Sequence, residues 1–223
     1  MKPKVVVITG ASSGLGEALA RACTKEGWKV YATARSEDKI KQLAKKIGCK
    51  SMKLDVTNYS ELQNVVRKIA KQEGSIDVWI NNAGGEHVAD LTELKKDLFE
   101  EIVAVNFSGV VYSFLEVPRY MKEGDFVQIL SSSAYTPREK EPAYASAKAA
   151  AAMFAESVRP TLQKKGIRVL NFYPGGMDTP FAQKAGLPLH KNALSPQEVA
   201  TLIVSALKLP RNMAVDTKIM RNA

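Results

Sequence analysis

The chain has 223 residues, of which 45% are hydrophobic and 25% charged, so it is long enough to bury a large core. No run of eighteen apolar residues occurs, and residues 1–4 lack the zones of a signal peptide, which argues against a membrane span or a secretory leader. Cys23 and Cys49 are the two cysteines and lack metal-ligand spacing, so we expect no disulfide framework and no metal. We predict one soluble, cytoplasmic domain over residues 1–223, with no membrane partner.

The net charge of +9 is compatible with three kinds of partner: nucleic acid, a membrane surface or an anionic small ligand. The lysines and arginines are spaced along predicted helices and loops with apolar residues between them, which is typical of a solvated basic face. No zinc finger, helix-turn-helix or RNA-binding signature is present. We therefore expect no nucleic-acid partner, and strongly salt-dependent binding to arbitrary duplex DNA would reopen that alternative.

Short apolar, β-branched runs alternate along the chain with stretches of helical periodicity. The predicted strands are residues 4–9, 29–33, 51–54, 76–80, 126–130, 167–172 and 213–219. The predicted helices are residues 15–26, 37–47, 59–72, 94–121, 144–164 and 196–209. This alternation predicts a doubly wound α/β fold, Rossmann-like, with a seven-stranded, mostly parallel sheet covered by helices on both faces.

A glycine-rich turn joins the first predicted strand to the first predicted helix. Glycine lets the backbone turn tightly and approach a pyrophosphate, and the helix N-terminus offers unpaired N–H groups and the positive end of a dipole. We therefore predict a nucleotide-binding loop formed by Gly10, Ser12, Ser13, Gly14, Leu15 and Gly16.

The G-x-x-x-G-x-G spacing of this loop, followed by five further segments in order, resembles the short-chain dehydrogenase/reductase family over nearly the whole chain. The further segments are Asp55-Val56-Thr57, Asn81-Asn82-Ala83-Gly84, Asn106, Tyr144 with Lys148, and Pro174-Gly175. The resemblance implies a nicotinamide dinucleotide cofactor. Its adenine would lie against Asp55 and Val56, and the other predicted cofactor-binding residues are Asn82, Ala83, Gly84, Pro174, Gly175, Met177 and Thr179.

Tyr144 and Lys148 are one turn apart on a predicted helix and therefore share a face. A free tyrosine ionises at about pH 10, and a neighbouring ammonium group lowers the pKa of a phenol toward neutral pH. By resemblance to the family, Tyr144 exchanges the proton with the substrate oxygen. Lys148 lowers the pKa of Tyr144 and binds the nicotinamide ribose. Asn106 is similar to the family's asparagine that holds a relay water, although an asparagine inside a helix can equally bind a neighbouring carbonyl.

Three serines follow the fifth predicted strand, and the family uses one of them to hold the substrate oxygen. Relatives usually show a hydrophobic strand followed by two serines, a variable residue and a small residue, and in this pattern Ser132 is the second serine. Along the sequence, however, Ser132 is one residue closer to Tyr144 than the catalytic serine is in most relatives, which would instead favour Ser131. Neighbouring strand residues face opposite sides, so only one of the two serines can face the nicotinamide. We predict Ser132, because the loop 135–143 absorbs a missing residue easily, whereas a shift in strand register would reverse every buried side chain upstream.

The second predicted strand ends in Ala34 and Arg35, where relatives specific for NAD carry an acidic residue. An arginine suits the 2′-phosphate, so we predict that NADP(H) is preferred; the competing interpretation is a surface arginine. Residues 181–194 are expected to form a short substrate lid. His87 and His190 have no matching ligands and are expected to be non-catalytic.

The resemblance implies an oxidoreductase that interconverts a carbonyl and an alcohol on a small molecule. The alternative is a regulatory protein that senses NADP(H) without catalysis, because a fold does not decide function. Small residues surround most of the predicted helix 144–164, including a run of four alanines at 149–152. Small side chains permit close helix approach, so we expect a homodimer or homotetramer.

Overall fold

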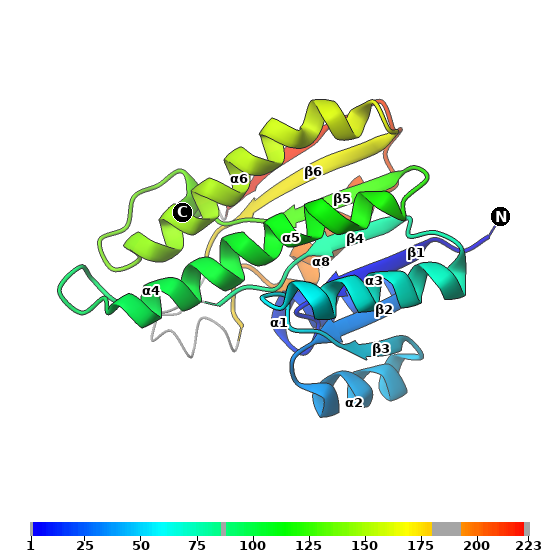
Figure 1. Cartoon of the computed structure of the whole chain (residues 1–223), viewed down its shortest axis with the longest axis horizontal. Coiled ribbons are helices and arrows are strands. Elements are labelled where there is room, and N and C mark those ends of the chain that lie inside the picture. Colours follow the sequence, from blue (N-terminus) through cyan, green and yellow to red (C-terminus); the bar gives the residue numbers. More distant parts are fainter. Residues whose placement is uncertain (1, 86–87, 180–192, 221–223) are drawn as a thin grey trace.

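The computed structural model describes residues 2–85, 88–179 and 193–220, and its centre is one parallel β-sheet (Figure 1). In the described part of the chain, seven strands lie in the order β3-β2-β1-β4-β5-β6-β7, and every pairing between neighbours is parallel. The strands are β1 (Val5–Thr9), β2 (Lys29–Ala34), β3 (Lys50–Lys53), β4 (Val78–Asn81), β5 (Gly124–Ile129), β6 (Ile167–Pro174) and β7 (Val215–Ile219).

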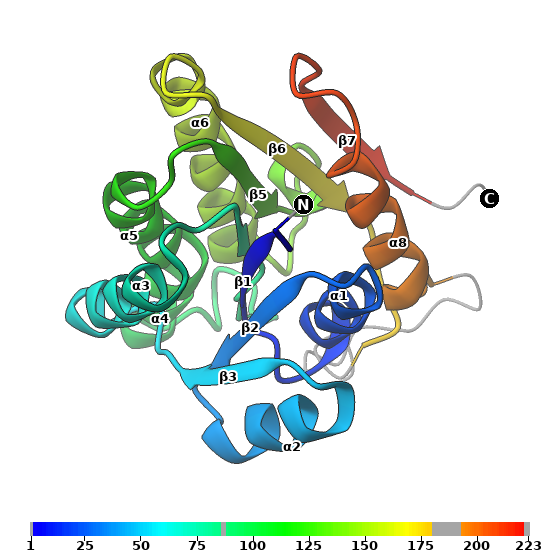
Figure 2. The ribbon, with the colours of Figure 1, turned by 90° about the vertical axis from the view of Figure 1, so that its right-hand side faces the viewer.

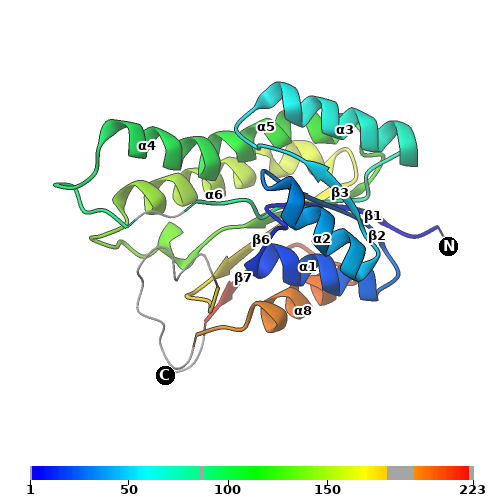
Figure 3. The same ribbon diagram turned by 90° about the horizontal axis from the view of Figure 1, so that it is seen from below.

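Helices cover both faces of this sheet, as the views from the side show (Figures 2 and 3). One face carries α1 (Gly14–Lys25) and α8 (Pro196–Ala206), with α2 (Glu37–Ile47) beyond the β3 edge. The other face carries α3 (Tyr59–Glu73), α4 (Lys96–Val103), α5 (Gly109–Glu116) and α6 (Pro142–Gln163). The predicted doubly wound, Rossmann-like fold is confirmed.

Side-chain alternation along the strands separates two apolar cores. In β1, Val6 and Ile8 pack into the core under α1 and α8, whereas Val5 and Val7 pack into the core under α3, α5 and α6. All four are fully buried, because a central parallel strand is covered on both sides. This is why the first predicted strand is a continuous apolar run rather than an alternating pattern.

The strand order reverses between β1 and β4. From β1 the chain moves outward through β2 to β3, and then returns to place β4 on the other side of β1. The loops after β1 and β4 therefore leave in opposite directions and open a crevice at the carboxyl ends of these strands. The sheet topology thus fixes the position of the candidate site.

The predicted helix 94–121 is not a single regular helix in the structure. After α4, residues Ala104–Ser108 form a π-helical segment in which the N–H of Gly109 donates to the carbonyl of Ala104, five residues earlier. Then α5 follows, and a 3₁₀ turn at Val117–Arg119 contains Pro118, which cannot continue the backbone ladder. The stretch is helical as predicted, but apolar periodicity does not reveal the extra residue in its wide turn.

By length and composition alone, the composite helix Lys96–Arg119 is apolar enough to cross a membrane. A core helix of a soluble protein meets the same criterion. In this fold, Val110, Phe114 and Val117 are buried in the core beneath the helix. We therefore interpret the segment as a helix that packs against the sheet.

A buried carboxylate joins α3 to the starts of two strands, at the end of the sheet opposite the crevice. Glu73 accepts hydrogen bonds from the Tyr31 hydroxyl at 2.7 Å and from the ammonium groups of Lys29 and Lys50 at 2.6 and 2.8 Å. The bonds from Lys29, then Lys50 and Tyr31, lower the pKa of Glu73 from its usual 4.5 to about 2. Folding therefore favours the charged form of this carboxyl group.

Replacing Glu73 with glutamine should destabilise the protein in a pH-dependent way. Because the folded pKa lies below the unfolded one, the carboxylate contributes its full stability above about pH 4.5, and this contribution is lost as the pH falls toward about 2. We expect Glu73→Gln to lose about 1–3 kcal/mol at neutral pH. Urea unfolding of both proteins from neutral pH down to about pH 2.5 measures the difference. A difference that stays constant over this range would contradict the assignment.

Candidate active site

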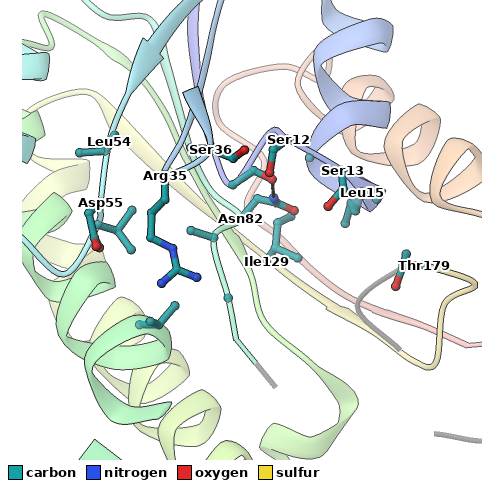
Figure 4. A pocket seen from close by; sticks show the side chains of 18 of the residues that line it. Ser12, Ser13, Leu15, Arg35, Ser36, Leu54, Asp55, Asn82, Ile129 and Thr179 are labelled. Carbon is teal, nitrogen blue, oxygen red and sulfur yellow. Dashed lines mark hydrogen bonds between the residues drawn. The ribbon is translucent and has the colours of Figure 1, made fainter. Parts of the chain in front are cut away.

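A cavity of about 360 Å³ lies in the crevice at the carboxyl ends of the strands. Figure 4 shows the side chains that surround it, which come from the ends of several strands and the loops after them, among them Ser12, Arg35, Asp55 and Asn82. Most of the predicted cofactor-binding residues line this cavity together. They are Gly10, Ser12, Ser13, Gly14, Leu15, Gly16, Arg35, Asp55, Val56, Asn82, Ala83, Gly84, Tyr144, Lys148, Met177 and Thr179.

Two glycines of the loop after β1 have no room for a side chain. A Cβ on Gly10, whose φ is +67°, would lie 2.7 Å from the Cα of Ala83, and a Cβ on Gly16 would lie 2.3 Å from the carbonyl oxygen of Gly10. The loop is therefore pressed against both the segment after β4 and the start of α1. Ser13 precedes α1 in an extended conformation and makes no capping hydrogen bond with its side chain, so it leaves the first N–H groups of the helix without that cap.

Asn82 and Thr9 hold the loops after β4 and β1 together. The Thr9 hydroxyl accepts from the backbone N–H groups of Asn82 and Ala83, both at 3.0 Å. The Asn82 side chain donates in return to the carbonyls of Thr9 at 2.9 Å and of Gly10 at 3.2 Å. These four hydrogen bonds fix the floor of the crevice where the strand order reverses.

The end of the cavity near β2 and β3 is bordered by Arg35 and Asp55. Arg35 leaves the end of β2 and extends into the space between Asp55 and Asn82 (Figure 4). Asp55 is held by a local turn, since its Oδ1 accepts from the backbone and the hydroxyl of Thr57 at 2.9 and 2.7 Å. A basic group thus lies beside a rigid loop at this end of the cavity.

Tyr144 and Lys148 lie one turn apart on α6, and both side chains are buried at the cavity. The Lys148 ammonium donates to the carbonyl of Ile129, the last residue of β5, at 3.0 Å and lies 5.7 Å from the centre of the Tyr144 ring. Tyr144 itself packs with Ile102 of α4 in a small apolar cluster. Both residues therefore occupy fixed positions between β5 and the composite helix.

Asn106 lies in the π-helical segment and is fully buried. Its Nδ2 donates to the carbonyl of Gly85 at 2.7 Å and to that of Ile102 at 2.9 Å. Its Oδ1 has no hydrogen-bond partner among the described residues and lies 3.1 Å from the place where a Cβ on Gly84 would stand. Asn106 thus ties the helix to the loop after β4 and presents an acceptor toward Gly84.

The three serines form a turn rather than a strand end. β5 ends at Ile129, and Ser132–Ala134 is a 3₁₀ turn capped by Ser131, whose hydroxyl accepts from the N–H of Ser133 at 3.1 Å. The alternation argument from strand geometry was therefore wrong for these residues. Ser131 already has a capping role, whereas the buried Ser132 hydroxyl contacts the guanidinium of Arg138 at 3.4 Å.

The segment after β6 contributes Met177 and Thr179 to the cavity. Pro174 and Gly175 do not line it: Pro174 is the last residue of β6, and the Gly175 N–H donates to the carbonyl of Ile219 beside it, at 2.8 Å. Most of the expected lid, 181–194, and both histidines lie outside the described residues. Asn106 and Ser132 border the site without lining the cavity itself.

These residues fit a nicotinamide dinucleotide. The glycine loop and the start of α1 suit the pyrophosphate, and the cavity extends from there to Arg35 at one end and to Tyr144 and Lys148 at another. A Cβ on Gly84 would stand 3.1 Å from Asn106 Oδ1 and 3.7 Å from Lys148 Nζ, so glycine keeps the space between these two polar groups open.

Comparison with known families agrees with this geometry. The sequence model of the short chain dehydrogenase family matches residues 4–188 of this chain. The chain belongs to this family. Short chain dehydrogenases are oxidoreductases, and the cavity described above is the candidate nucleotide-binding site of this one.

Individual relatives match along almost the full length of this short chain dehydrogenase. An uncharacterized oxidoreductase of Staphylococcus haemolyticus is 31% identical over 98% of this chain and 96% of its own. An alcohol dehydrogenase from the archaeon Thermococcus sibiricus, solved in complex with 5-hydroxy-NADP, is 28% identical with a TM-score of 0.90, over 99% and 96% of the two chains. A 3-ketoacyl-(acyl-carrier-protein) reductase from Brucella melitensis, solved with NADH, shares the fold at 22% identity and a TM-score of 0.89, over 97% and 96%.

Sequence reasoning missed several residues that line the cavity of this short chain dehydrogenase. Ser36 and Lys39 lie near Arg35, at the start of α2. The sequence could have indicated them, because the predicted helix begins directly after Arg35 and its first turn must lie near that residue. The others are apolar walls that no motif marks: Leu54, Val105, Ile129 and Leu130.

Proposed function

We propose that this short chain dehydrogenase interconverts a carbonyl and an alcohol on a small molecule, with NADP(H) as cofactor. The observation that carries the proposal is the buried pair Tyr144 and Lys148, which lines the same cavity as the glycine loop. A cofactor-binding cavity alone would suit a regulatory protein that senses NADP(H) equally well. Proton transfer requires more, namely a buried phenol beside an ammonium group, and the cavity has this pair at the end away from Arg35.

Each polar group has a separate task in the proposed reaction. NADP(H), when bound, supplies or accepts the hydride. Tyr144 gives its proton to the substrate oxygen in reduction and takes it back in oxidation. Lys148, held by the Ile129 carbonyl, places a positive charge beside the ring, which favours the phenolate.

Ser132 and Asn106 complete the proposed set. The Ser132 hydroxyl holds the substrate oxygen and stabilises the charge that develops on it. Ser132 is preferred to Ser131 because the Ser131 hydroxyl caps the 3₁₀ turn. Asn106 presents its Oδ1 toward Gly84 and is suited to hold a water molecule that returns the proton to Tyr144 through Lys148.

The preference for NADP(H) over NAD(H) rests on the β2 end of the cavity. Ala34, Arg35, Ser36 and Lys39 line it, so the cavity lining after β2 supplies two cations, and the carboxylate at this end, Asp55, comes from the loop after β3. A 2′-phosphate needs such donors, whereas a free 2′-hydroxyl is bound by an acidic residue there. The likeness to the archaeal alcohol dehydrogenase solved with 5-hydroxy-NADP supports the same choice.

We further propose a cytoplasmic homodimer or homotetramer that binds neither membranes nor nucleic acid. The two cysteines are free thiols, in keeping with a reducing compartment. Three large apolar side chains are exposed on neighbouring helices: Phe99 of α4 at 44%, Leu115 of α5 at 51% and Met153 of α6 at 68%. Such a face suits burial against a second copy of the chain.

Substitution of Tyr144 by phenylalanine tests the proposed chemistry. It removes the proton donor and keeps the ring, so turnover should fall at least about a hundredfold while NADPH affinity stays nearly unchanged. Lys148→Ala should weaken both, because Lys148 serves the tyrosine and the cofactor. The measurement is NADPH oxidation over a panel of ketones and aldehydes, with cofactor titration beside it. If Tyr144→Phe keeps more than about a tenth of the rate, or if the wild type binds NADPH but reduces no carbonyl, the proposal fails.

The cofactor preference is tested by the double substitution Ala34→Asp with Arg35→Ala. The aspartate offers an acceptor to a ribose 2′-hydroxyl and repels a 2′-phosphate, so the preferred cofactor should change from NADPH to NADH. Dissociation constants of both cofactors, measured for both proteins, report the change. Equal affinities of the wild type for NADH and NADPH would refute the preference.

Charge placed on the exposed apolar face should separate the copies of the chain. We expect the wild type to have the mass of a dimer or tetramer in light scattering and Met153→Glu to shift it toward the monomer. Glu156→Gln, an exposed position on the same helix, serves as the control and should leave the mass unchanged. A wild type that is monomeric at micromolar concentration would contradict the proposal.

A further inference from the structure

The loop between β5 and α6 brings an arginine to the serine that we assign to the substrate oxygen. Arg138 Nη2 lies 3.4 Å from the Ser132 hydroxyl, six residues earlier in the chain. Ser132 is buried, whereas the Arg138 side chain remains 45% exposed. The guanidinium therefore reaches from the surface of the protein to the buried Ser132 hydroxyl.

A buried carboxylate holds this arginine in place. Glu141 Oε2 lies 3.8 Å from Arg138 Nε and accepts a hydrogen bond from the Ser133 hydroxyl at 2.8 Å. The Glu141 side chain is only 7% exposed, and the residue immediately precedes α6, which carries Tyr144. The position of the guanidinium is thus fixed by the turn that holds Ser132 and by the start of the helix that holds Tyr144.

The pairing with Glu141 leaves much of the guanidinium available. In the described ranges, the Arg138 side chain hydrogen-bonds or ion-pairs only with the Ser132 hydroxyl and the Glu141 carboxylate, and neither contact uses Nη1. A guanidinium presents five N–H donors in a planar fork that matches a carboxylate. A further cation at this end of the sheet is Lys218 of β7, whose Nζ lies 4.0 Å from the Tyr135 ring centre.

We propose that Arg138 binds a carboxylate of the substrate, so that the enzyme acts on 2-oxo or 3-oxo acids and the corresponding hydroxy acids. This inference rests on the proposed function, in which Ser132 holds the reacting oxygen. Because Arg138 touches Ser132, the anionic group that it binds must be adjacent to the reacting carbonyl or one carbon removed from it. A carboxylate at this distance receives a charge-assisted hydrogen bond that a neutral ketone or ester lacks.

Two other roles for Arg138 make different predictions. If Arg138 only orients Ser132, its loss should slow acidic and neutral substrates alike. If it only pairs with Glu141, its loss should lower stability and leave substrate choice unchanged. Only a direct contact with the substrate makes the effect of Arg138 depend on whether the substrate carries a carboxylate.

A binding experiment separates this proposal from the proposed chemistry. Benzoylformate, a 2-oxo acid, is titrated by calorimetry into protein saturated with NADP⁺, and methyl benzoylformate is the neutral probe. We expect the acid to bind the wild type at least about tenfold more tightly than it binds Arg138→Gln, as the loss of one charge-assisted hydrogen bond requires. Arg138→Lys should be intermediate, because it keeps the charge but not the fork.

Lys140→Gln is the matched control, since it removes the same charge two residues away on the same loop. It should bind benzoylformate as the wild type does. No acid binding by the wild type, or equal losses in Arg138→Gln and Lys140→Gln, would overturn the contact with Arg138. Urea unfolding of each variant shows that the fold is retained.

Kinetics with the same two probes completes the test. Arg138→Gln should lower the ratio of kcat/KM for the acid to kcat/KM for the ester by about tenfold or more. Acetoacetate and its ethyl ester repeat the comparison for a 3-oxo acid. Reduction of other ketones that depends on Tyr144, without an effect of Arg138 on the ratio for either pair, would refute this inference and leave the proposed function intact. Benzoylformate binding that depends on Arg138, with no carbonyl reduced, would support the contact between Arg138 and the carboxylate but refute the proposed function and, with it, the action on oxo acids.

Discussion

The close approach of the loops after β1 and β4 is the constraint on which the rest of the site depends. At Gly10 a single added carbon would lie 2.7 Å from the backbone of Ala83, and Asn82 and Thr9 join the same two loops by four hydrogen bonds. This contact lies where the strand order reverses, so the crevice opens directly above it. The start of α1, the tip of β2 and the segment after β4 all take their positions around the cavity from this junction.

Much of this arrangement is local and was therefore readable from the sequence. The helix predicted at residues 37–47 matches α2, because the apolar positions repeat with helical spacing and Gly48 ends the helix in a left-handed conformation. The glycine loop was equally clear, since it stands between a buried strand and an amphipathic helix. Parallel strands then bring every such loop to one end of the sheet, so the predicted cofactor residues had to gather there, and most of them line one cavity.

The sequence could not reveal features that depend on particular hydrogen bonds and ion pairs, whether these are local or join distant segments. The serines after β5 form a 3₁₀ turn because Ser131 caps it, and an alternating pattern carries no sign of that cap. The position of Arg138 depends on Glu141, which is buried only once α6 has packed. Pro174 and Gly175 were expected at the cofactor, yet the Gly175 N–H pairs with β7, which lies more than forty residues later in the chain.

The π-helical segment changes how the sequence of the helix Lys96–Arg119 must be aligned with that of a regular α-helix. Each residue of an α-helix turns the chain by about 100°, so eight residues would set Val110 about 80° away from Ile102. The wider turn at Ala104–Ser108 absorbs one residue and brings the two close to the same side of the helix. The segment therefore behaves as a one-residue insertion whose angular offset is cancelled locally. An alignment with a regular helix needs a gap here, and without one it would equate buried positions of α5 with exposed ones.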